Sequence, residues 1–187
     1  VSKLTTDQIV ALTTDQVPKL TTAQIVALTT AQLAAMEPAD IAKLTTTQIV
    51  ALTTTQMPKL TTDQIVALTT DQVSKLSAAQ VAVLTTEQVA AMEPADIAKL
   101  TTAAIVSLTT EQVAGMTTDQ VAALTTAQIK VMETADVAAL TVAQVVALTT
   151  DQSSVLTASQ VANMTSTQIA AMEAADIAKL STAAIVS

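Results

Sequence analysis

The sequence contains no Phe, Trp, Tyr, His, Cys or Arg and only one Gly. Without Cys, disulfides and thiolate metal sites are excluded. Catalysis lacks its usual residues as well, because there is no His or Cys, no Gly-rich phosphate loop and no Ser beside a plausible base. We therefore expect no catalytic residue, no cofactor and no enzymatic activity.

Positive charge is scarce too. The chain has 8 Lys against 16 acids, a net charge of -8, whereas nucleic-acid binding needs clustered basic residues. No run of about 18 apolar residues is present, which argues against membrane insertion. Half of the residues are nevertheless hydrophobic, too many for a disordered chain. Since these are Ala, Leu, Ile, Val and Met, we expect a thin core that runs along the chain.

A repeat of eight residues dominates the sequence. Leu or Met stands at every eighth position from Leu4 to Leu180, which defines 23 octads. We letter each octad a to h, with Leu4 at a and Ala11 at h. The consensus is Leu-Thr-Thr-x-Gln-Ile/Val-x-Ala, and no linker or change of composition interrupts it. We predict a single solenoid over residues 1–187, as a segment of a longer protein.

Several folds could be built from such a repeat. In one continuous helix, eight residues turn about 80° beyond two full turns, so the Leu row would spiral and no coiled-coil stripe would form. A β-solenoid is favoured by the Ile, Val and Thr content, but strand alternation fails in Leu-Thr-Thr-x-Gln and turn residues are scarce. We predict an all-α solenoid of about 23 very short capped helices, one per octad, with an inner core of Leu/Met at a and Ile/Val at f.

The ends of these helices are marked by polar residues. Thr5 and Gln8 fit a capping box, with Thr at the N-cap and Gln at N3, so the first helix should run from Thr6 to Ala11. Eight acids occupy d, in the first turn, and seven Lys occupy h, at the end. Both placements suit the helix dipole.

Proline supports the same frame. Pro38 and Pro94 fall at c, the first helical position, where Pro is favourable. Pro18 and Pro58 fall at g, near the helix end, where no further helical hydrogen bond is needed.

A second period of 40 residues overlies the first, and Lys19, Lys59, Lys99 and Lys179 follow it. Two explanations remain open. The duplicated unit contained five octads, or five octads complete a whole number of superhelical turns so that equivalent positions stack.

Four octads replace Thr at b by Glu and Gln at e by Asp. Paired carboxylates are hard ligands, so these residues are candidates for a calcium site. Two carboxylates fall short of the six to eight oxygens that calcium prefers, and we favour an alternative helix start, with the acids near the dipole and Lys43, Lys99 or Lys179 after the Asp. The candidate calcium ligands are Glu37, Asp40, Glu93, Asp96, Glu133, Asp136, Glu173 and Asp176.

The motif Leu-Thr-Thr-x-Gln-Ile/Val-x-Ala-Leu, as in residues 4–12 and 60–68, resembles the octapeptide arrays of very large bacterial proteins of the adhesin type. The resemblance implies an extracellular or cell-surface location and a structural role as a stalk, spacer or filament-forming segment. Near-identical units without special chemistry favour the same role. Alternatives are a repeat scaffold that binds a peptide or glycan and, more remotely, ice binding through the regular Thr pairs. Self-association, end to end or side by side, is the expected partnership.

Overall fold

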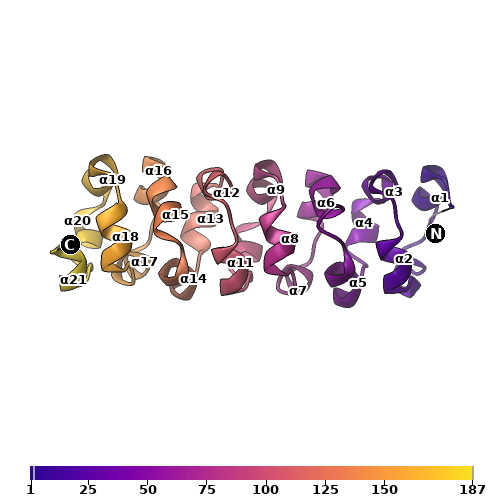
Figure 1. The fold of residues 1–187 in the computed structure, drawn as a ribbon, viewed down its shortest axis with the longest axis horizontal. Helices are drawn as coiled ribbons and strands as arrows, with labels where there is room; N and C mark the ends of the chain where they lie inside the picture. Colours follow the sequence, from indigo (N-terminus) through magenta and orange to yellow (C-terminus); the bar gives the residue numbers. More distant parts are fainter. Residues whose placement is uncertain (2, 187) are drawn as a thin grey trace.

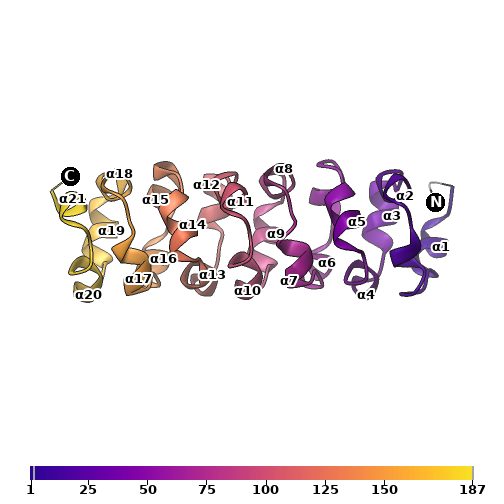
Figure 2. The same cartoon turned by 90° about the horizontal axis from the view of Figure 1, so that it is seen from below.

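The computed structural model describes residues 1 and 3–186, which form an elongated rod with the two chain ends at its opposite ends (Figures 1 and 2). All regular secondary structure in these residues is helical. The prediction of an all-α solenoid is therefore confirmed, and the β-solenoid alternative was wrong.

The described residues contain 21 α-helices and two 3-10 helices, one element in each octad. None of these helices has the length and apolarity that a membrane-spanning helix needs. The α-helices are α1 (Thr6–Val10), α2 (Thr22–Val26), α3 (Thr30–Ala35), α4 (Pro38–Ile41), α5 (Thr46–Ala51), α6 (Thr62–Val66), α7 (Thr70–Val73), α8 (Ala78–Ala82), α9 (Thr86–Ala91), α10 (Pro94–Ile97), α11 (Thr102–Val106), α12 (Thr110–Ala114), α13 (Thr118–Ala123), α14 (Thr126–Val131), α15 (Thr134–Ala139), α16 (Val142–Val146), α17 (Thr150–Ser154), α18 (Ala158–Asn163), α19 (Ser166–Ala171), α20 (Ala174–Ile177) and α21 (Thr182–Ile185). The 3-10 helices are η1 (Val17–Lys19) and η2 (Met57–Lys59).

The bend between octads is made by two extended residues, at a and b. Between α13 and α14, Leu124 has φ -56° and ψ 134°, and Thr125 has φ -72° and ψ 156°. Many helices instead end on a left-handed residue, usually Gly, but no described residue here has a positive φ. This geometry explains how the array folds with a single Gly.

Proline at g changes the element that an octad forms. Pro18 has no N–H to continue an α-helix. In its octad the carbonyl of Thr13 accepts hydrogen bonds from the backbone N–H groups of Gln16 (2.9 Å) and Val17 (3.1 Å), and the 3-10 helix η1 follows. Pro58 has the same effect in η2. The expectation that a six-residue α-helix fits every octad was therefore wrong here, and the α-helices elsewhere span four to six residues.

Helices along the rod pack on the helix three octads further along the chain, as α10 does on α13 and α12 does on α15. Side chains also reach backbone atoms 28 and 31 residues earlier, which lie at the end of the helix four octads back. One turn of the solenoid therefore takes between three and four octads. Because five octads exceed one turn and fall short of two, the 40-residue period does not stack equivalent positions, and duplication of a five-octad unit remains as its explanation.

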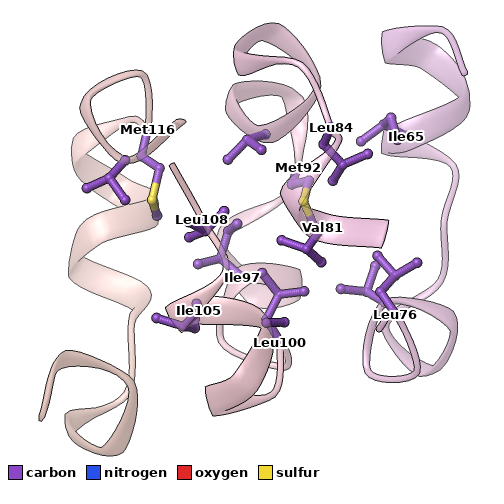
Figure 3. Close-up of a cluster of buried hydrophobic side chains, with 14 of the residues drawn as sticks. Ile65, Leu76, Val81, Leu84, Met92, Ile97, Leu100, Ile105, Leu108 and Met116 are labelled. Carbon is purple, nitrogen blue, oxygen red and sulfur yellow. The ribbon is translucent and has the colours of Figure 1, made fainter. Parts of the chain in front are cut away.

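The predicted core rows are confirmed. Ile97 and Val121 at f are fully buried, and Leu84 at a is 5% exposed. Figure 3 shows Val81, Leu84 and Ile97 among the side chains gathered between helices of successive turns. Two groups are only partly buried: position a of the first three octads (Leu4, Leu12, Leu20) and position f of three late octads (Val161, Ile169, Ile177). Position a therefore packs toward the preceding turn, and position f packs toward the following one.

Candidate functional site

No pocket is present among residues 1 and 3–186. Apart from Ser153 at f, the polar side chains that become buried lie at position e, between successive turns of the rod. These residues are the candidate functional site, because they determine how successive turns contact each other.

The glutamine at e caps its own helix. In α13 the Oε1 atom of Gln120 accepts a hydrogen bond from the backbone N–H of Thr117 at 2.8 Å. The hydroxyl of Thr117 in turn accepts one from the backbone N–H of Gln120 at 3.2 Å. All α-helices with Thr or Ser at b and Gln at e show this reciprocal pair, so the predicted capping box is confirmed.

The other end of the same amide caps a second helix. The Nε2 atom of Gln120 donates to the carbonyl oxygens of Val89 at 2.8 Å and Met92 at 2.6 Å. These carbonyls lie at the C-terminal end of α9, where the last carbonyl groups of a helix lack the usual helical partners. The Val89 carbonyl also accepts the backbone N–H of Met92 at 3.1 Å. Gln120 is fully buried. One side chain thus satisfies the start of one helix and the end of another, one turn earlier.

We call this arrangement a glutamine bridge: a Gln at e whose Nε2 atom donates to backbone carbonyl oxygens 28 and 31 residues earlier. Donor–acceptor distances for these two acceptors range from 2.6 to 3.3 Å. The Gln residues that form bridges are 32, 48, 56, 64, 72, 80, 88, 112, 120, 128, 144, 152, 160 and 168.

The bridge was not predicted from the sequence, which assigned Gln at e to capping alone. A signal was available. Glu serves as well as Gln at N3 of a capping box, yet e is never Glu in this chain. The choice of Gln over Glu points to a second requirement for a hydrogen-bond donor.

The four Glu/Asp octads replace this donor by a carboxylate. Their Asp residues are at most 4% exposed, whereas Glu37, Glu93, Glu133 and Glu173 are exposed N-cap residues without a side-chain cap bond. No third acidic side chain joins any candidate calcium pair among the described residues. The structure brings no described Lys into ion-pair contact with these acids.

Burial has its clearest electrostatic effect at Asp136. Desolvation raises the pKa of this carboxyl from 3.8 to about 6, and the negative charge of Glu133 adds to the increase. Its Oδ2 atom is buried without a hydrogen-bond partner. Burial also raises the pKa of Asp40 and of Asp96, the latter against a hydrogen bond from Thr70. An ionised carboxylate can only accept hydrogen bonds, so it cannot replace the Gln amide facing backbone carbonyls.

Comparison with known families identifies the repeat. The model of the ALTTAQ repeat matches residues 19–46, 33–70, 62–93, 89–126 and 129–166. The chain belongs to the ALTTAQ repeat family. Because the matches overlap or follow one another closely, the ALTTAQ array is tandem over most of the chain. The search of curated proteins and the search of solved structures found no match.

Other departures from the ALTTAQ consensus also affect contacts between turns. Ala104 replaces Gln at e and is fully buried. Near it, the hydroxyl of Ser107 donates to the carbonyl of Ala78 at 2.9 Å, across the turn. Ser153 replaces the apolar residue at f, where it is fully buried and its hydroxyl has no hydrogen-bond partner.

Proposed function

We propose that this ALTTAQ array is a non-catalytic stalk, spacer or filament-forming segment of a secreted or surface-attached bacterial protein. The observation that carries the proposal is the repeated glutamine bridge. Each turn joins the preceding one through the same atoms, so the rod lengthens as octads are added without new chemistry. The extended shape of the rod (Figure 1) suits a segment that separates the parts attached to its ends.

A repeat scaffold for a peptide or glycan has less support. Binding surfaces usually carry aromatic or Arg anchors, which this chain lacks, and residues 1 and 3–186 form no pocket. Ice binding has less support for a different reason. The Thr at b is used as a helix cap, and the octads turn around the axis, so the second Thr of successive octads faces different directions.

We also propose that the array associates end to end through further glutamine bridges. Among the described residues, the Nε2 atoms of Gln8, Gln16 and Gln24 donate to no carbonyl, and the carbonyls of Met164 and Met172 accept no Gln amide. If a second array is placed head to tail, the Gln amides of one copy face these carbonyls of the other at the spacing of a glutamine bridge. Further repeats of the same chain would supply the same partners. A head-to-tail contact of this kind does not close on itself and so builds filaments.

Small-angle scattering and electron microscopy across a range of concentrations test the shape and the association. We expect rods at low concentration that lengthen without thickening as concentration rises. A compact particle would contradict the spacer role, and rods that stay monomeric would contradict end-to-end association alone. Surface location is tested separately in the bacterium that makes the full-length protein. An antibody against the array should label intact cells or the medium, and labelling only after lysis would contradict the proposed location.

A further inference from the structure

Two neighbouring octads in the middle of the rod both lack a glutamine bridge. Asp96 and Ala104 stand at e in these octads. By the spacing of the other bridges, the carbonyls that would accept from them are those of Ile65 and Leu68 and of Val73 and Leu76. In the described part of the chain, none of these four carbonyls accepts a side-chain amide from the following turn.

We propose that this interface, between residues 93–107 and residues 65–78 of the preceding turn, is a joint at which the interior of the rod bends or opens first. One turn holds only three to four octads, and each octad can form one bridge to the preceding turn. The loss of two bridges therefore removes half or more of the bridges between these two turns. Elsewhere in the interior a missing bridge is isolated. Asp136, for example, lies between the bridges of Gln128 and Gln144.

The joint keeps enough contacts to close again. Leu76, Leu100 and Ile105 remain buried there, and Figure 3 shows them in the cluster between neighbouring turns. The polar contacts across the joint are few. The Ser107 hydroxyl donates to the Ala78 carbonyl at 2.9 Å, and the Thr70 side chain partly offsets the rise in the pKa of the Asp96 carboxyl. Apolar contact is non-directional, whereas the bridges fix donor and acceptor atoms, so loss of bridges lowers the resistance to bending more than it removes apolar packing.

The same pair of replacements recurs 80 residues later, at Asp176 and Ala184. If the array is a spacer, as proposed above, a joint between stretches of bridged turns lets a long rod bend at a defined place. The joint itself rests on the bridges and not on the surface location. Rods that stay monomeric, or a failure of the cell-labelling experiment, would therefore leave it standing.

Hydrogen exchange of the whole 187-residue chain, followed by mass spectrometry, tests the joint. Amides in α7, α10 and α11 should exchange at least about tenfold faster than those in α9, α13 and α14, because exchange reports local opening and each missing hydrogen bond favours it. Equal protection of the two sets of helices would overturn the proposal.

A matched pair of variants isolates the bridge. Ala104→Gln places an amide at e, whereas Ala103→Gln places the same side chain at the exposed neighbouring position d. Ala104→Gln should slow exchange in α7 and α11 about tenfold, and Ala103→Gln should leave it unchanged. The same effect from both variants would contradict the proposal.

The reverse experiment covers the case in which the joint cannot accommodate the longer side chain of Ala104→Gln. Gln64→Ala and Gln72→Ala together remove two neighbouring bridges that lie between the intact bridges of Gln56 and Gln80. This double variant should create a second joint, with exchange in α3 and α4 faster by at least about tenfold. If that double variant keeps its protection there, two missing bridges do not make a joint and the proposal is wrong.

Discussion

The amide nitrogen of Gln120 lies 2.6 Å from the carbonyl oxygen of Met92, 28 residues earlier in the chain. The same amide accepts, through its oxygen, the N–H that opens its own helix. A helix of four to six residues has more unpaired backbone groups at its ends than paired ones within it. Helices this short therefore persist because a neighbouring turn completes their hydrogen bonds.

The apolar rows contribute the other part of the stability. Leu84→Ala should lower the free energy of unfolding by about 2–5 kcal/mol, since it removes a buried side chain and leaves a cavity. Leu4→Ala, in the partly buried first turn, should cost clearly less. Chemical denaturation of the two variants makes the comparison. Equal, small losses would mean that position a is not the core row.

Ser153 offers a test in the opposite direction. Ser153→Val should raise the free energy of unfolding by about 1–2 kcal/mol, because it removes a buried hydroxyl without a partner and restores the apolar residue found at f elsewhere. Ser154→Val is the control, since Ser154 is exposed. Thermal unfolding of both variants decides the matter, and a Ser153→Val protein less stable than the parent would contradict the burial assigned to Ser153.

Stability should also depend on pH through Asp136. Its pKa is raised in the folded state to about 6, so folding favours the protonated carboxyl. The stability that this preference contributes is fully present below about pH 4 and is lost as the pH rises through about 6. Asp136→Asn cannot ionise and should not show this loss. The free energy of unfolding of the parent should therefore fall relative to that of Asp136→Asn as the pH rises. We expect this fall to be of the order of 1 kcal/mol between about pH 4.5 and about pH 7.5. Unfolding midpoints measured at both pH values provide the test, and a constant difference would show that Asp136 titrates normally.

Folding should not require calcium. Each Glu/Asp pair has one exposed and one buried carboxylate, and the described residues bring no third acid to it. Addition of a strong chelator is expected to leave the melting temperature unchanged, with the same chelator saturated with calcium as the control. A large drop with the free chelator alone would identify these pairs as ligands.

Much of the fold could be predicted from the sequence because it depends on local signals. The period of eight, the Thr5–Gln8 capping pattern and the apolar rows at a and f were sufficient to predict one short helix per octad. The number of octads per turn was not predictable, because it depends on how the extended residues at a and b, such as Leu124 and Thr125, orient consecutive helices. The bridges depend on that geometry and were missed with it.

Prolines and acids show a second limit. Pro18 was expected near the end of an α-helix, but it is the middle residue of the 3-10 helix Val17–Lys19, because the loss of one N–H in so short a helix is enough to change its type. Asp96 was read as part of a helix start, which it is. Its burial between turns follows only from the position of α7 one turn earlier, and no local pattern contains that information.

The central claim is that the amide at e joins successive turns, and Gln120→Glu compared with Gln8→Glu tests it most directly. Glu keeps the length of the side chain and the oxygen that completes the capping box, but it has no N–H to donate. Gln120 forms a bridge and Gln8, in the first turn, does not. In urea denaturation at about pH 7.5, we predict that Gln120→Glu lowers the free energy of unfolding by about 2 kcal/mol or more and that Gln8→Glu changes it by less than about 0.5 kcal/mol. Equal effects of the two substitutions would contradict the account.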